Sequence, residues 1–330
     1  MINPLTVVEA GPSFAGRLLT SATKLTIRTA LQVGCLAPHL PWPYEAIELV
    51  ASMVPKNPHV KRHTVRLPHA TAEMITPPGV DGDGVVLYFH GGGFLTCGTN
   101  THSALITRLS RYSNFPVLSV NYRMLPTHSV WEAIQDGLDA YWWLRRKYEP
   151  EQIVLAGDSA GGYLALSVVN KILFEKPAGL ALISPLLQLS PTSRNAHPNI
   201  ECDAMFGREA FKALLSLVKR SGGVYEPLDD LRGTLPPTMI HVSGHEALLH
   251  DADLACRRFA EIGVRCEVRV WPGQIHVFQI AAAVVPEARE SLRQIGKFIA
   301  EAVSPAGFKD VVQNKSDWAN GLIYRTGTVG

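Results

Sequence analysis

The stretch IVLAGDSAGGYLAL, residues 153–166, decides the fold. Four apolar residues run directly into GDSAG at 157–161, and helix-forming residues follow at once. A serine at a sharp strand-to-helix turn takes strained backbone angles, and small residues two positions to either side let the strand and the helix approach without a Cβ clash. The stretch therefore predicts that the hydroxyl of Ser159 is lifted off the end of a strand, as a nucleophile requires.

Ala160, the residue after this serine, begins the predicted helix. Free N–H groups and the helix dipole favour negative charge at a helix start. The amide of Ala160 is therefore predicted to stabilise an oxyanion beside Ser159. Taken alone, the motif is also compatible with a glycine-rich helix start that only packs.

Strands and helices alternate along the rest of the chain. The predicted strands are 60–67, 70–75, 85–89, 117–120, 152–156, 180–183, 239–242 and 266–270. The predicted helices are 14–36, 103–112, 130–147, 161–173, 208–219, 251–262 and 286–303. Strands that alternate with helices of this length predict an α/β protein with a parallel sheet covered on both faces.

The composition excludes several functions. The 330 residues are 46% hydrophobic, enough for a sizeable core, and a formal net charge of +2 without a basic run predicts no nucleic-acid partner. The five cysteines form no CxxC pair, so we expect a reducing, cytoplasmic compartment. No nucleotide-binding motif or cluster with metal-ligand spacing is present, so we expect no cofactor and no metal.

The N-terminal region has no continuous apolar run with a cleavage site, so we expect neither a signal peptide nor a membrane span. Apolar residues recur at three- and four-residue steps from Phe14 to Leu36, which predicts an amphipathic helix. This helix either packs on its own domain or lies on a membrane surface or a lipid.

Two further motifs could serve a nucleophilic serine. HGGGF at 90–94 follows the apolar strand 85–89, and its three glycines expose backbone N–H groups that can bind an oxyanion. His276 lies in a loop past the last predicted strand, where it can meet Ser159 because the ends of parallel strands converge at one edge of a sheet.

The acid that would orient this histidine has several candidates. Glu246 directly follows the strand 239–242, whereas Asp251 and Asp253 come later, where an acid is expected at a helix start anyway. We favour Glu246, and Asp251 stays open.

Together, HGGGF at 90–94, GDSAGG at 157–162, the acid in 242–251 and His276 resemble the hormone-sensitive-lipase-like branch of the α/β-hydrolases, the bacterial family IV carboxylesterases and lipases. NYRMLP at 121–126 is similar to that branch's YRLAP element. The resemblance covers about residues 60–302. It departs from the family where Glu246-Ala247-Leu248 replaces a DPL-type element and where Val277 replaces the glycine of HGF.

The resemblance implies an α/β-hydrolase fold with a mostly parallel eight-stranded sheet and an α-helical cap. One domain would span 1–330, with the cap at about 1–58 and 190–235 and a tail at 304–330. An oxyanion hole would form from the amides of Gly92, Gly93 and Ala160.

The resemblance also implies hydrolysis of a small-molecule carboxylic ester through an acyl-enzyme on Ser159, with His276 as base and Glu246 as acid. It makes a homodimer plausible. Cleavage of amides or lactones is an alternative, as is a non-catalytic ligand-binding protein on the same scaffold. The acyl-chain length stays open.

Overall fold

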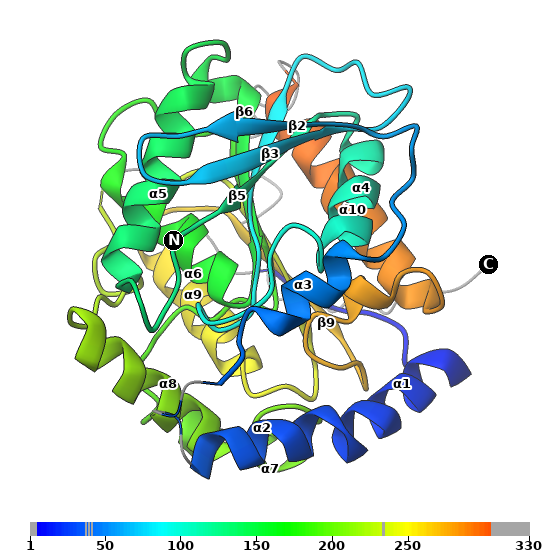
Figure 1. Ribbon diagram of the computed structural model, residues 1–330, viewed down its shortest axis with the longest axis vertical. Coiled ribbons are helices and arrows are strands. Elements are labelled where there is room, and N and C mark those ends of the chain that lie inside the picture. The colour runs from blue at the N-terminus through cyan, green and yellow to red at the C-terminus, as the bar shows by residue number, and fades with distance from the viewer. Residues whose placement is uncertain (1–4, 37, 39, 41, 233–234, 305–330) are drawn as a thin grey trace.

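The computed structural model describes residues 5–36, 38, 40, 42–232 and 235–304, and a nine-stranded sheet forms its centre (Figure 1). In spatial order the strands are β1 (Leu5–Val8), β9 (Cys266–Trp271), β8 (Thr238–Ser243), β7 (Gly179–Ile183), β6 (Ile153–Asp158), β4 (Val85–Phe89), β5 (Val117–Asn121), β3 (Thr71–Thr76) and β2 (Lys61–Arg66). Neighbours are parallel except in the pairs β2–β3 and β3–β5. The predicted, mostly parallel sheet is confirmed.

The expected number of eight strands is wrong, because β1 adds a ninth. It pairs in parallel with β9, from Leu5 opposite Glu267 to Val8 opposite Val270. Four residues at the end of a chain carry too little periodicity to predict a strand, and here it is the open edge of β9 that supplies the hydrogen-bonding partners.

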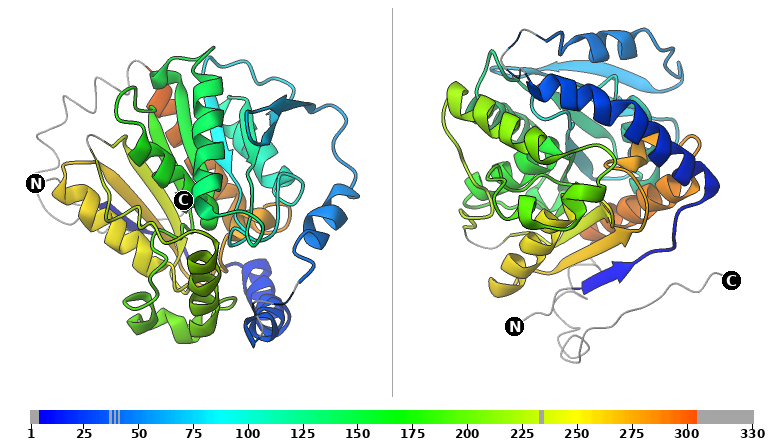
Figure 2. Two further views of the ribbon diagram at one scale, coloured as in Figure 1. Left: turned by 60° about the vertical axis from the view of Figure 1, so that its left-hand side comes forward. Right: turned by 90° about the horizontal axis from the view of Figure 1, so that it is seen from below.

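Helices cover both faces of the sheet (Figure 2). One face packs on α5 (Val130–Leu144), α6 (Ala160–Lys171) and α9 (Leu249–Glu261), and the other on α4 (Ser103–Ser113) and α10 (Pro286–Val303). In β4, the side chains of Val85, Leu87 and Phe89 pack on the face covered by α5, α6 and α9. Those of Val86 and Tyr88 pack on the face covered by α4 and α10. Because successive side chains of a strand alternate, a strand buried on both faces has no polar position.

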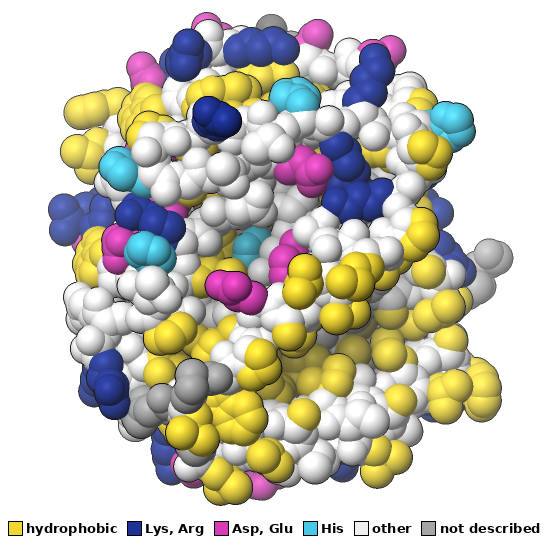
Figure 3. All heavy atoms as spheres, viewed as in Figure 1, with side chains coloured by type: hydrophobic (Ala, Val, Ile, Leu, Met, Phe, Trp, Pro, Cys, Tyr) yellow, Lys and Arg dark blue, Asp and Glu magenta, His cyan; other side chains and the backbone are white. Residues whose placement is uncertain are grey.

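The helix predicted at 14–36 is two helices, α1 (Phe14–Leu25) and α2 (Ile27–Leu36). They separate at Thr26, whose hydroxyl donates to the carbonyl of Ala22 at 2.7 Å. The backbone of Thr26 has φ −110° and ψ −68°, away from ordinary helical angles, and this departure separates the two helices. The short helix α3 (Ala46–Ser52) follows. Hydrophobic side chains gather on the surface over α1, α2 and α3 (Figure 3).

The segment between β7 and β8 leaves the sheet and forms η2 (Arg194–Ala196), α7 (Asn199–Cys202) and α8 (Arg208–Ser221). α2 packs against α8, so the N-terminal helices and this segment lie together beyond one end of the sheet (Figure 1). The remaining short elements are η1 (Pro150–Gln152) and η3 (Phe278–Ala281). None of the described helices combines the length and apolar character needed to cross a bilayer. The predicted tail, apart from Ser304, lies outside the described residues.

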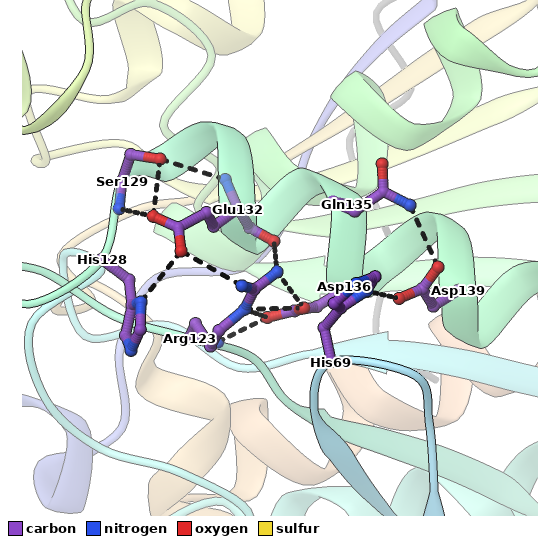
Figure 4. Close-up of polar contacts among 8 residues, drawn as sticks. All are labelled: His69, Arg123, His128, Ser129, Glu132, Gln135, Asp136 and Asp139. Carbon is purple, nitrogen blue, oxygen red and sulfur yellow. Dashed lines mark hydrogen bonds and ion pairs between the residues drawn. The ribbon is translucent and has the colours of Figure 1, made fainter.

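A buried carboxylate fixes α5 to the end of β5 (Figure 4). Asp136 is fully buried and accepts hydrogen bonds from the backbone N–H of Arg123 at 2.7 Å and from its Nε at 3.0 Å. Arg123 also contacts Glu132 at 3.1 Å, and Glu132 forms a capping box with Ser129 at the start of α5. One carboxylate therefore holds the loop after β5 and the first turns of α5 together.

We expect Asp136→Ala to lower the free energy of unfolding by about 3 kcal/mol, because it leaves the amide and guanidinium of Arg123 without their acceptor. Chemical denaturation measures this. Asp139→Ala is the matched control on the same helix, since within the described residues the Asp139 carboxylate bonds to the exposed side chains of His69 and Gln135. Its expected cost is about 0.5 kcal/mol. Equal losses in the two variants would contradict this account of Asp136.

Candidate active site

Ser159 lies at the turn between β6 and α6 with φ 51° and ψ −121°. A non-glycine residue with positive φ is strained and persists only where its surroundings hold it. Here the amide of Ser159 donates to the carbonyl of Ile183 at 2.9 Å. The side chain thus stands at the carboxyl edge of the sheet, as the sequence predicts.

The glycines around this serine have a steric task. A Cβ on Gly161 would lie 2.0 Å from the carbonyl oxygen of Phe89, and one on Gly157 would lie 2.4 Å from the carbonyl oxygen of Gly161. Real Cβ atoms do not approach backbone so closely, so only glycine lets α6 start against the ends of β6 and β4.

The glycine loop after β4 runs beside Ser159. A Cβ on Gly91 would lie 3.1 Å from the Cβ of Ser159, and 2.2 Å from Oδ2 of Asp158. Gly92 and Gly93 have φ 109° and φ 65°, in the region that favours glycine. Three consecutive glycines are therefore required by the close approach and by the backbone angles.

Asp158 connects this loop to the nucleophile turn. Its Oδ1 accepts from the hydroxyl of Tyr88 at 2.6 Å and from the amide of Gly91 at 3.0 Å, and its Oδ2 lies 3.2 Å from Nε2 of His102. All three partners of the carboxylate are buried. Burial disfavours the charge, but the interaction with His102 and the hydrogen bond from Tyr88 together favour it, and the pKa of Asp158 lies below its usual range.

Sequence reasoning missed Asp158 and His102 as site residues. Asp158 lies inside the GDSAG motif, and an acid at this predicted buried position indicates that its carboxylate has a specific hydrogen-bonding partner. His102 had no local signal among twelve histidines, because its role depends on a contact across 56 residues.

His276 and Glu246 form a buried pair. Nδ1 of His276, in the loop between β9 and η3, lies 2.5 Å from Oε2 of Glu246, which follows β8. Burial lowers the pKa of His276, but the Glu246 carboxylate outweighs this effect and raises the pKa above its ordinary value. Because Nδ1 faces a carboxylate, it carries the proton, and Nε2 is the nitrogen free to accept one.

Ser184 joins the two loops that carry this pair. Its hydroxyl donates to Oε1 of Glu246 at 2.6 Å and accepts from the amide of Val277 at 3.2 Å. Glu246 also accepts from the amide of Ser243 at 2.7 Å. Val277 itself has φ 50°, which is strained for a β-branched residue and lies where the family has glycine. The loop is thus held by hydrogen bonds in a conformation that glycine would adopt freely.

Asp251 does not reach the histidine. Its carboxylate accepts from the amides of Leu187 and Gln188 at 2.7 and 3.2 Å, and from Nε of Arg194 at 2.8 Å. Asp253 lies farther along α9, and burial raises its pKa. Of the three acids considered from the sequence, Glu246 contacts His276, whereas Asp251 binds the backbone of the segment after β7.

Among the residues that the structure describes, one group of side chains has donor atoms close enough to hold a metal ion. These atoms, on His69, Asp136 and Asp139, lie within 4.8 Å of one another. Asp136 is already neutralised by Arg123, and His69 contacts Asp139 directly at 2.7 Å (Figure 4). Both carboxylates thus already have side-chain partners, Arg123 for Asp136 and His69 for Asp139, and we assign no metal to the group.

Comparisons with known proteins agree with this geometry. The family model for the α/β-hydrolase fold matches residues 86–280. The chain is 47% identical over 329 residues to the carboxylesterase/phospholipase LipF of Mycobacterium tuberculosis (strain ATCC 25618 / H37Rv), covering 94% of this chain and 88% of the relative. It is 50% identical over 295 residues to the esterase LipU of the same strain, covering 84% and 99%.

Among solved structures, an esterase from the bacterial hormone-sensitive lipase family matches with a TM-score of 0.76 at 27% identity, covering 86% of this chain and 98% of that chain. The sheet order, the strained serine turn and the glycine loop fit these similarities. The chain therefore belongs to the α/β-hydrolase family, in its hormone-sensitive-lipase-like branch.

Proposed function

We propose that this protein hydrolyses carboxylic esters of small molecules, with Ser159 as nucleophile, His276 as base and Glu246 as the acid that orients it. The observation that carries the proposal is the 2.5 Å contact between Glu246 and His276 at the same sheet edge as the strained Ser159 turn. Relatives named as a carboxylesterase/phospholipase and as an esterase, at 47% and 50% identity, support the same chemistry.

The proposed reaction starts when Nε2 of His276 takes the proton of Ser159 and the serine oxygen attacks the ester carbonyl. The tetrahedral oxyanion is stabilised by the amides of Gly92, Gly93 and Ala160. His276 then gives the proton to the leaving alcohol. Water resolves the acyl-enzyme by the same steps, with His276 again acting as base.

Asp158 is a positioning residue in this proposal. It holds the amide of Gly91, the residue before the two proposed oxyanion donors, and it is covalently next to Ser159. A single buried carboxylate therefore sets the distance between the nucleophile and the amides that must receive the oxyanion. Its pair with His102 keeps that carboxylate charged and in place.

Residues 5–8 fall within the expected cap of about 1–58 but belong to the sheet as β1. We propose that α1, α2, α3 and the described part of 190–235 form a cap over this site. A guanidinium nitrogen of Arg28, in α2, donates to the carbonyl of Asp203. The Asp203 carboxylate accepts from the amide of Ala247 at 2.8 Å, next to Glu246, and the ring of Phe206 stands edge-on to His276 at 4.8 Å. The 203–206 segment thus lies between an N-terminal helix and the acid–base pair.

Two alternative functions can be tested against this proposal. Amide or lactone cleavage would use the same groups, and a non-catalytic binding protein would have no need of a preformed acid–base pair. A homodimer, lipid contact by residues 14–36 and a cytoplasmic location stay predictions, and the proposed reaction requires none of them.

Ser159→Ala is expected to lower kcat for p-nitrophenyl acetate by at least about 10⁴-fold, because no other group supplies the nucleophile. Circular dichroism and the melting temperature should stay close to those of the parent, since the substitution removes one hydroxyl without changing the backbone strain. Turnover at the parental rate by the folded variant would contradict the assignment.

Glu246→Gln is expected to reduce kcat by about 10³- to 10⁴-fold, because it removes the charge that stabilises the imidazolium. Since that charge raises the pKa of His276, the acidic limb of the kcat/KM profile should also shift to lower pH. Asp251→Asn is the control. It should lower stability by about 3 kcal/mol through the buried Arg194 pair and leave kcat close to the parental value. The opposite pattern would assign the acid to Asp251.

Asp158→Ala is expected to lower kcat by about 10²-fold with little change in KM, because the oxyanion amides lose their positioning while ester binding remains. Asp158→Asn keeps an oxygen that can accept from Gly91 and Tyr88, so it should restore most of the rate. Steady-state kinetics of both variants test this. A loss confined to stability, or equal losses in both variants, would show a purely structural role.

A further inference from the structure

α3 is attached to the protein through its polar side. Oε1 of Glu48 accepts from the amide of Asn100 at 2.7 Å, and Oε2 accepts from the amide of Thr101 at 3.0 Å. Just before the helix, the carbonyl of Tyr44 accepts from the hydroxyl of Thr96 at 2.6 Å. These contacts fix the helix on the loop that follows the HGGGF motif.

The apolar residues of α3 and of the turn after it consequently face solvent. Ile47, Leu49, Val50 and Met53 are 54%, 60%, 64% and 72% exposed. A surface helix of a globular protein normally shows the opposite arrangement, with its apolar stripe on the core and its charges outward. An outward apolar stripe held by an inward carboxylate is typical of a surface that contacts something else.

α1 and α2 continue this apolar surface. We call the following exposed side chains, on the three helices and the residue after α3, the apolar rim: Phe14, Leu18, Leu25, Ile27, Val33, Leu36, Ile47, Leu49, Val50 and Met53. α1 packs on the body instead through small residues such as Gly16, which lies against Gln274. Hydrophobic side chains gather over these helices around a hollow in this face (Figure 3).

The charges around the rim have one predominant sign. Residues 10–44 include Arg17, Lys24 and Arg28 and no acidic residue, although the whole chain has 31 basic and 29 acidic side chains. Arg17 and Lys24 are exposed. Two exposed acids lie nearby: Glu45 just before α3, and Glu209 in the first turn of α8, the helix on which α2 packs. Glu48 faces inward. Basic side chains beside exposed apolar ones suit an anionic lipid surface.

We propose that α1, α2 and α3 dock on the surface of an anionic phospholipid layer, with the apolar rim inserted at the boundary between headgroups and acyl chains. A lipid layer accommodates side chains from three separate helices without needing a complementary shape. Because α3 is bonded to the 96–101 loop next to the glycine loop, docking places the lipid beside the carboxyl edge of the sheet. The docking itself does not depend on the proposed ester hydrolysis, although the delivery of lipid esters to Ser159 rests on it.

Co-sedimentation with vesicles tests the proposal, using Ser159→Ala so that no lipid is cleaved. We expect binding to phosphatidylcholine vesicles containing about one-third phosphatidylglycerol to be roughly tenfold tighter than to phosphatidylcholine alone. Arg17→Gln/Lys24→Gln should abolish this preference. The α3 variant Ile47→Ser/Val50→Ser/Met53→Ser should weaken vesicle binding by at least about a hundredfold. If this variant does not fold, Leu18→Ser/Leu25→Ser in α1 tests the same apolar rim and should also weaken binding.

Leu173→Ser/Phe174→Ser is the matched control. These side chains are 62% and 82% exposed but lie between α6 and β7, at the opposite edge of the sheet, so their loss should leave vesicle binding unchanged. With Ser159 restored, kcat/KM for soluble p-nitrophenyl acetate should be the same in parent, rim variants and control. Vesicle binding and ester hydrolysis are thus measured separately, so the docking proposal and the proposed function can each be contradicted without the other.

Three results would overturn the proposal. The first is no binding of the parent to either vesicle. The second is equal loss of binding in the rim variants and the control. The third is a parent that light scattering shows to be a dimer in solution and that the α3 substitutions convert to a monomer, because the rim would then be a contact between two copies of this chain.

Discussion

The proposed active site depends on how closely α6 approaches the end of β4. The backbone of Gly161 lies where any side chain would collide with the carbonyl of Phe89, and Gly91 lies equally close to Asp158. This contact forces Ser159 into its strained conformation and brings the glycine loop beside it. A methyl group at either glycine would separate the elements that must act together.

Buried carboxylates then hold the surrounding loops, each with a different set of partners. Asp158 holds the glycine loop, Glu246 orients His276, Asp251 neutralises Arg194, and Asp136 fixes the loop after β5 to α5. Each accepts at least one backbone N–H or is matched by a charged side chain, which offsets the cost of burial. Their individual roles follow from these partners, since residue type alone does not distinguish them.

The N-terminal helices connect the outer surface to the same site. Arg28 of α2 contacts Asp203, whose carboxylate supports the loop of Glu246, while Glu48 of α3 holds the loop next to the glycines. α1 adds a further contact, from the hydroxyl of Thr20 to the carbonyl of Gly273 near His276. These helices therefore connect the exposed apolar surface to the loops of Glu246, His276 and the glycines through direct contacts.

The sequence by itself determined the alternating architecture, the Ser159 turn and the position of His276, because strand runs, helical periodicity and glycine patterns are local. It did not determine β1, which needs the edge of β9. It also left Glu246 and Asp251 open, and missed Asp158 with His102. Only the tertiary structure decided these points, because the free edge of a strand and the partner of a buried charge are both set by distances between segments far apart in the chain.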